Sequence, residues 1–333
     1  MTSDDHEGIE KAANLGLTPG LARFVAEIGA AWELHPDLTS VSPTEARRIA
    51  EEVRRPWTRG GPVMAAVDEL AVPSPHGSVP DVVKVRRYHP RRETTGALIY
   101  LHGGGWTLFS LETHDRLMRE YAGRAGVIVL GVDYSLAPEA KYPVALDQVV
   151  AVARAAADPG AGLLEAGTPL AIGGDSAGAN LALAAAIELR EEGHPELLRA
   201  MLLNYGVFTR YSSAEAVERF GGPGNMLTHE EMEGFWANYL RDEKDAEDPL
   251  ASPLSADLAS LPPTLLVVAS NDLLAEQSLA LAHRLREANV SVELDVYEGA
   301  CHSFLEAVSI SSLADQALAN SAAWLRKAVT PAR

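Results

Sequence analysis

The segment Gly-Gly-Asp-Ser-Ala-Gly at residues 173–178 constrains the fold of this chain more than any other feature. It follows the apolar run Pro169–Ile172 and precedes the helix-forming run Ala179–Leu189. A Gly-x-Ser-x-Gly pattern at such a junction forms a nucleophile elbow, a sharp turn between a strand and a helix. Glycines flank the serine because a Cβ there would crowd the neighbouring backbone. The pattern predicts that Ser176 is a nucleophile at the mouth of a sheet.

A glycine-rich loop lies upstream of this elbow. The apolar run Ala97–Leu101 leads directly into His102-Gly103-Gly104-Gly105. Such a loop can turn backbone N–H groups toward a developing oxyanion. A flexible surface loop is the alternative interpretation. The position of His102-Gly103-Gly104-Gly105 after a buried strand and ahead of the elbow favours the oxyanion role.

Candidates for an acid and a base follow the elbow in the order Ser, Asp, His that one large class of serine enzymes uses. Asp272 comes just after Pro263–Ala269, which reads as a buried strand. His302 comes after the strand-like run Ser291–Tyr297. We therefore expect Asp272 to orient His302, and His302 to act as the base for Ser176.

Each of these residues also has a purely structural interpretation. Asp272 is placed to cap a helix over Ala275–Ala288, and Glu276 is a rival acid or a first-turn charge favoured by the helix dipole. His302 is alternatively a buried, hydrogen-bonded core histidine. The order of the three residues along the chain favours the catalytic interpretation.

The remaining pattern alternates strands and helices, which predicts a mostly parallel sheet with helices on both faces. Further strands are expected at Val63–Val72, Val82–His89 and Val127–Asp133, and helices at Leu117–Arg124 and Ala145–Ala157. Helices at Ile9–Leu34 and Pro43–Arg55 precede the first strand, and Gly206–Asp248, with a helix at His229–Leu240, interrupts the alternation. These two outlying regions are predicted to form the halves of a lid.

The net charge of −18 over 333 residues argues against two classes of binding partner. Nucleic acids and anionic membrane surfaces require clusters of Lys and Arg, so neither is expected. The start Met1–Glu7 is acidic, and no apolar run approaches the roughly 18 residues of a membrane span. With Cys301 as the single cysteine, expected to be a buried small hydrophobe, the sequence predicts a cytoplasmic protein.

Several motifs together resemble one known family. Besides the two glycine motifs, Asp133–Glu139 reads Asp-Tyr-Ser-Leu-Ala-Pro-Glu, similar to a family segment with arginine in place of Ser135. Leu227-Thr228 with Phe235-Trp236 and Tyr239 resembles the family's cap helix, and Asp248–Leu254 matches a further family pattern. The chain thus resembles the hormone-sensitive-lipase-like α/β-hydrolases, the bacterial family IV esterases, from about Val63 to its end.

The resemblance implies an α/β-hydrolase fold, with a mostly parallel central sheet flanked by helices and a helical cap. The core would comprise residues 61–205 and 249–333, and the cap residues 1–60 and 206–248. It implies Ser176, His302 and Asp272 as a catalytic triad, and the amides of Gly104, Gly105 and Ala177 as oxyanion donors. It also implies a small-molecule ester substrate with a short acyl chain, no metal or organic cofactor, and a possible homodimer.

Other functions and site residues stay open at this level. The same triad serves amidases, lactonases and acyltransferases, and the scaffold also occurs in non-catalytic ligand-binding proteins. Trp106, Tyr205 and Trp236 are candidates to line a substrate pocket, with ordinary packing as the alternative. Departures from the family pattern at Ser135, Glu276 and Ser303 concern substrate scope rather than the triad.

Overall fold

One eight-stranded sheet organises the computed structural model, which describes residues 15–75 and 80–330. The strands follow the order β1-β2-β4-β3-β5-β6-β7-β8 across the sheet. β2 is antiparallel to β1 and to β4, and all other neighbours are parallel. The strands are β1 (Ala66–Pro73), β2 (Val82–His89), β3 (Ala97–Leu101), β4 (Ile128–Asp133), β5 (Leu170–Asp175), β6 (Ala200–Asn204), β7 (Thr264–Asn271) and β8 (Val292–Cys301).

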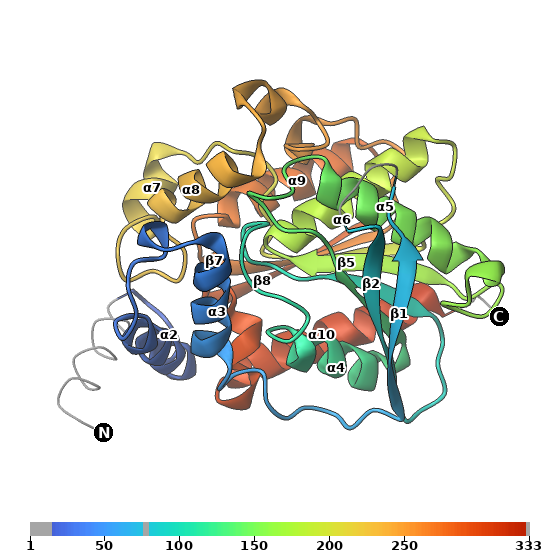
Figure 1. Ribbon diagram of the computed structural model, residues 1–333, viewed down its shortest axis with the longest axis horizontal. Helices are drawn as coiled ribbons and strands as arrows, with labels where there is room; N and C mark the ends of the chain where they lie inside the picture. Colours follow the sequence, from blue (N-terminus) through green and yellow to red (C-terminus); the bar gives the residue numbers. More distant parts are fainter. Residues whose placement is uncertain (1–14, 76–79, 331–333) are drawn as a thin grey trace.

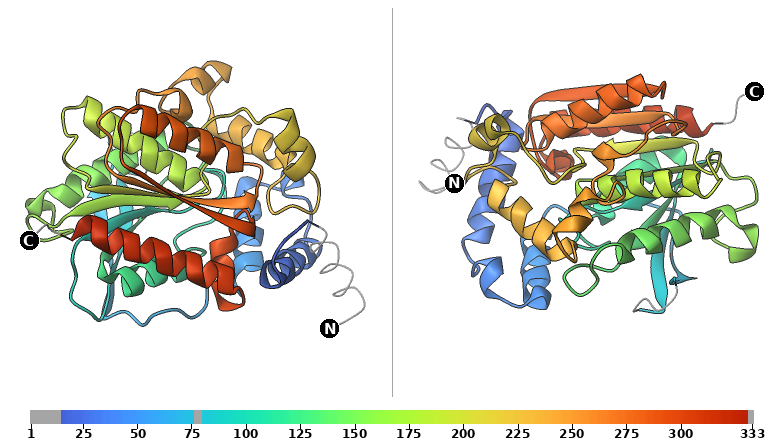
Figure 2. Two further views of the ribbon diagram at one scale, coloured as in Figure 1. Left: turned by 180° about the vertical axis from the view of Figure 1, so that it is seen from behind. Right: turned by 90° about the horizontal axis from the view of Figure 1, so that it is seen from above.

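Helices cover both faces of the sheet, which confirms the predicted layer arrangement (Figures 1 and 2). One face carries α5 (Val144–Ala157), α6 (Ala177–Glu191) and α9 (Ala275–Glu287). The other carries α4 (Asp115–Tyr121) and α10 (Ser312–Val329). The central parallel strands β3, β5 and β6 are therefore buried on both sides, as parallel strands enclosed by crossover helices must be.

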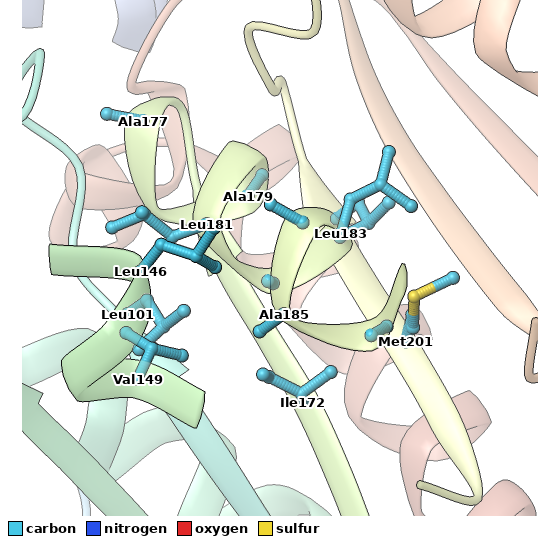
Figure 3. Packing of buried hydrophobic residues seen from close by; sticks show 14 of the residues in the cluster. Leu101, Leu146, Val149, Ile172, Ala177, Ala179, Leu181, Leu183, Ala185 and Met201 are labelled. Atoms are coloured by element: carbon cyan, nitrogen blue, oxygen red, sulfur yellow. The ribbon is translucent and has the colours of Figure 1, made fainter. Parts of the chain in front are cut away.

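The strand side chains divide between these two layers with the period of two that a strand imposes. In β3, Ile99 and Leu101 belong to the cluster under α5 and α6, whereas Leu98 and Tyr100 belong to the cluster under α4 and α10. Figure 3 shows Leu101 near Leu146 and Val149 of α5. Every β3 side chain is buried, so this strand is fixed from both sides.

Most predicted elements are found with ends shifted by a few residues. β1 begins at Ala66 rather than Val63, and α4 begins at Asp115 and ends at Tyr121 in a π-helical turn, Ala122–Gly126. The helix predicted over Ile9–Leu34 is α2, Pro19–Trp32; the part of that prediction before residue 15 lies outside the described residues. A proline at the first position of α2 explains its start, because proline needs no N–H partner there. Short 3₁₀ helices lie at Leu38–Ser40, Pro159–Ala161, Glu243–Glu247, Pro253–Ser255 and Phe304–Ser309.

Four helices lie together at one end of the molecule (Figures 1 and 2). They are α2, α3 (Pro43–Arg54), α7 (Ala214–Phe220) and α8 (His229–Tyr239). Ala46 and Ala50 of α3 cluster with Leu108 of the core and with Phe235 of α8. Segments distant in sequence thus meet over the loop that follows β3. Their separation from the core at residues 60, 205 and 248 stays a prediction.

Within residues 15–75 and 80–330, no helix combines the length and the apolar character that a membrane crossing needs.

Candidate active site

Ser176 occupies the turn between β5 and α6, as the sequence predicts. Its backbone has φ 53° and ψ −118°, a strained conformation for a residue with a side chain. A Cβ at Gly174 or Gly178 would collide with the carbonyl oxygen of Leu101 on the neighbouring strand. The two glycines therefore let the turn pack directly against β3.

His302 and Asp272 lie beside this serine. His302 Nε2 is 3.0 Å from Ser176 Oγ, and His302 Nδ1 is 2.7 Å from Asp272 Oδ2. The carboxylate accepts from Nδ1–H, so Nε2 is left to accept the proton that the serine hydroxyl donates. All three side chains are buried. The structure thus brings the three predicted residues into one hydrogen-bonded chain.

The two acid candidates occupy different places. The second oxygen of Asp272, Oδ1, accepts a hydrogen bond of 3.0 Å from the amide of Leu274, so this carboxylate also supports the start of α9. Glu276 accepts hydrogen bonds of 2.6 Å from the amide and the hydroxyl of Ser213, the N-cap of α7. Glu276 therefore connects α9 to α7, whereas the hydrogen bond to His302 comes from Asp272.

The glycine-rich loop after β3 has an unusual backbone. Gly104 and Gly105 have φ values of 114° and 58°, in the region that favours glycine. A Cβ at Gly103 would meet Asp175, the residue before Ser176, and one at Gly105 would enter the ring of Phe235. The loop thus lies against both the elbow and α8. Ala177 is the first residue of α6, where a backbone amide lacks an intrahelical partner.

Buried polar side chains support the glycine-rich loop after β3. The hydroxyl of Tyr134 donates to the carbonyl of His102 at 2.7 Å, and the two rings stack with centroids 4.5 Å apart. Burial lowers the pKa of His102 to about 3. His102 is therefore neutral, and its Nδ1–H donates to the carbonyl of Gly103 at 2.7 Å.

A histidine and a carboxylate pair next to the elbow. His114 Nε2 is 3.2 Å from Asp175 Oδ2, and Tyr100 donates to Asp175 Oδ1 at 2.8 Å. Burial opposes the charge on His114, but the Asp175 carboxylate outweighs it and raises the pKa of His114. The hydrogen bonds of Thr113 fit a charged His114 ring. The Thr113 hydroxyl donates its hydrogen to the carbonyl of Ser110, so it must accept a hydrogen bond from His114 Nδ1. Sequence reasoning missed this pair, because His114 precedes α4 and belongs to no motif or strand end that would place it beside Asp175.

The three predicted pocket residues are packed against other aromatic rings. Trp106 stacks on Tyr239 with ring centroids 4.2 Å apart and lies 4.6 Å from Trp236. The rings of Tyr205 and His302 pack in a T-shaped arrangement with centroids 5.2 Å apart. All three predicted residues are almost completely buried. Their contact with a substrate stays a prediction.

The departures at Ser135 and Ser303 have local explanations. The amide of Ser135 donates a hydrogen bond to the side-chain oxygen of Gln148, and the hydroxyl of Ser135 accepts one from the side-chain nitrogen of the same residue. Ser303 has φ 58°, a left-handed conformation that explains why glycine suits this position. Cys301 is buried, as predicted, and burial raises the pKa of its thiol well above the usual range.

This geometry suits nucleophilic catalysis by a serine. A nucleophile within hydrogen-bond reach of a base, which a third group orients, is the arrangement that activates a hydroxyl. Across residues 15–75 and 80–330, no three His, Cys, Asp or Glu side chains are placed to hold a metal ion.

Comparisons with known proteins identify the family of the chain. A family model described as alpha/beta hydrolase fold matches residues 98–306. An acetyl esterase of Salmonella choleraesuis is 37% identical over 274 residues, which are 81% of this chain and 82% of the relative. A hyperthermophilic esterase from the archaeon Pyrobaculum calidifontis has a TM-score of 0.85 at 30% identity, covering 95% of this chain and 99% of that one. A thermostable carboxylesterase from a metagenomic library has a TM-score of 0.82 at 32% identity, covering 88% and 99%.

Proposed function

The chain belongs to the α/β-hydrolase family, among the hormone-sensitive-lipase-like carboxylic ester hydrolases, and from that premise we propose that it hydrolyses short-chain acyl esters with a Ser176, His302 and Asp272 triad. The observation that carries the proposal is the unbroken hydrogen-bond chain from Ser176 Oγ through His302 to Asp272.

Catalysis begins with acylation of the serine. Ser176 Oγ attacks the ester carbonyl while His302 Nε2 takes its proton, and Asp272 stabilises the imidazolium that results. The tetrahedral intermediate collapses, His302 protonates the departing alcohol, and the acyl group stays on Ser176. Water, activated by His302 in the same way, then attacks the acyl-enzyme. The bond between the acyl carbon and Ser176 Oγ breaks, His302 returns the proton to that oxygen, and the acid is released. Every proton in this cycle passes through one imidazole.

The oxyanion is held by backbone amides of Gly104, Gly105 and Ala177. The left-handed φ values of Gly104 and Gly105 support this role, because they turn the loop away from the extended backbone of β3. Amides fixed before the reaction stabilise developing charge without reorganising during it.

Gly105→Ala is expected to displace the amide of residue 105 and to lower turnover about 10²- to 10³-fold, the usual effect when one oxyanion donor no longer reaches the oxyanion. The added Cβ would meet the Phe235 ring, and the loop would have to move. Turnover of p-nitrophenyl acetate measures the effect, with circular dichroism to verify folding. Gly167→Ala is the matched control, because Gly167 has φ 76° but open space around its Cβ position. Equal turnover in the two variants would contradict the role of Gly105.

The acyl group is proposed to be short. Trp106, Trp236 and Tyr239 are buried against one another, so a long chain would have to separate them. Phe235 of α8 also packs on Gly105, which narrows the approach to the loop. The relatives named acetyl esterase support the same substrate class.

A panel of p-nitrophenyl esters from two to sixteen carbons tests this size limit. The specificity constant is expected to peak at two to about six carbons, because the hydrophobic gain of a longer chain requires aromatic contacts to open. Esters of the same acids with a second alcohol serve as the control for leaving-group effects. A maximum at twelve or more carbons would contradict the proposed substrate class.

The cellular setting is proposed to be the cytoplasm. A net charge of −18 and one buried cysteine support an enzyme that acts on small dissolved esters, away from nucleic acids and anionic membranes. Residues 1–60 and 206–248 are proposed to form the cap, and a homodimer is the proposed assembly.

A further inference from the structure

The loop that would hold the oxyanion is strained beyond its glycines. Trp106 and Phe109, which both carry large side chains, have φ values of 56° and 69°. Such conformations are unfavourable for residues with a Cβ and persist only where the surroundings enforce them. The loop from Gly104 to Phe109, here called the oxyanion loop, therefore needs contacts that hold it in place.

Helix α3 supplies such contacts from a distant part of the chain. Arg47, Glu51 and Arg54 lie four and three positions apart, so they form one stripe along the helix. Glu51 accepts a hydrogen bond of 2.7 Å from the hydroxyl of Ser110, the residue that follows the loop. The guanidinium of Arg54 lies 5.0 Å from the centre of the Phe109 ring.

Arg54 also reaches the segment that carries the base. Its guanidinium is 3.4 Å from the carboxylate of Glu306, in the 3₁₀ helix that follows His302. Both side chains are only 5 to 6% exposed, so this ion pair is largely shielded from water. One end of the stripe is thus anchored beside the base segment.

Arg47 makes the contacts most directly related to the oxyanion loop. Its Nε donates to the carbonyl of Thr107 at 2.8 Å, and its Nη2 donates to the carbonyl of Ala137 at 2.8 Å. The same guanidinium pairs with Glu139 at 3.0 and 2.5 Å. Ala137 in turn donates from its amide to the carbonyl of Trp106 at 2.8 Å. Arg47 therefore joins the oxyanion loop to the segment 135–139.

We propose that Arg47 is a positioning residue for ester hydrolysis, which holds the oxyanion loop in its reactive conformation through the carbonyls of Thr107 and Ala137. This inference rests on the proposed function. It assigns to α3 a part in the chemical step, in addition to covering the site. Glu51 and Arg54 support the same loop at its far end.

Arg48 provides a matched control on the same helix. Within the part of the chain that the structure describes, it pairs with Glu45 and Glu52 of α3 on an exposed surface and bonds to no residue of the core. Exposed pairs of this kind contribute little to stability. Loss of Arg48 removes one positive charge from α3, as loss of Arg47 does, but leaves the oxyanion loop untouched.

The experiment compares Arg47→Met, Arg47→Lys and Arg48→Met on p-nitrophenyl acetate, with kcat and KM measured separately. A second readout is the rate at which a serine-directed fluorophosphonate labels Ser176 covalently. Arg47→Met is expected to lower kcat about 10- to 100-fold with KM within about twofold, because a displaced oxyanion loop loses transition-state contacts rather than substrate contacts. Labelling is expected to slow in parallel. Arg48→Met is expected to match the wild type.

Arg47→Lys keeps the proposal testable if Arg47→Met does not fold. A lysine retains the cation but cannot place donors on both carbonyls and on Glu139, so kcat is again expected to fall. A folded variant at Arg47 with unchanged kcat, or with a change in KM alone, would overturn the inference while leaving the esterase proposal intact. A wild-type protein that neither hydrolyses esters nor labels at Ser176 would overturn both.

Discussion

Replacing Ser176 with alanine is expected to lower ester turnover on the order of 10⁴-fold or more, with little effect on folding. The hydroxyl is the attacking group, so no acyl-enzyme can form without it. The variant removes the nucleophilic oxygen from the strained elbow while keeping a Cβ, and the packing of β5 against α6 is unchanged. Turnover of p-nitrophenyl acetate and the thermal midpoint measure the two effects.

Ser278→Ala is the matched control for this change. The hydroxyl of Ser278 in α9 is also buried, has no hydrogen-bond partner among the described residues, and lies outside the proposed triad. Its loss is expected to leave turnover near the wild-type value. If Ser176→Ala kept more than a tenth of the wild-type turnover, another group would be the nucleophile.

Asp272→Asn is expected to cost roughly 10³- to 10⁴-fold in turnover, and Glu276→Gln less than about tenfold. The amide oxygen of the new side chain could still accept from the Leu274 amide, which preserves the start of α9, but its NH₂ group would face His302 Nδ1. That donor favours the tautomer with the proton on Nε2, which cannot accept the serine proton. Turnover of the two variants on one ester, measured side by side, checks the difference.

Glu276→Gln is a fair comparison because it makes the same chemical change a short distance along the chain, where the carboxylate serves Ser213 instead. Its expected effect is on the junction between α9 and α7. A larger loss for Glu276→Gln than for Asp272→Asn would move the acid to Glu276.

The elbow, and the meeting of Asp272 and His302 beside it, could be predicted from the sequence because a local motif specifies the first and strand order the second. Glycines flank Ser176 where a Cβ would strike β3, and the motif therefore identifies the turn. Asp272 and His302 follow two strands that are parallel neighbours of the same sheet, β7 and β8. Parallel strands bring their carboxyl ends to one edge, so chain order was enough to predict that these residues meet.

Contacts between distant segments could not be predicted in the same way. Arg47 lies in a charged helix whose composition gives no sign that it binds the carbonyls of Thr107 and Ala137. The pairing of His114 with Asp175 likewise depends on how α4 packs under the sheet. Helix α10, which covers one face of the sheet, was not predicted at all, although its buried residues follow a helical period.

Covalent labelling of the wild-type protein tests the central claim most directly. A serine-directed fluorophosphonate forms a stable adduct only with a serine that a neighbouring base activates. Mass spectrometry of the digested protein is expected to show one adduct per chain, on the peptide that contains Ser176, with ester hydrolysis lost in proportion to labelling. The account would be contradicted by an adduct on a different residue, or by a protein that hydrolyses esters at full rate without an adduct at Ser176.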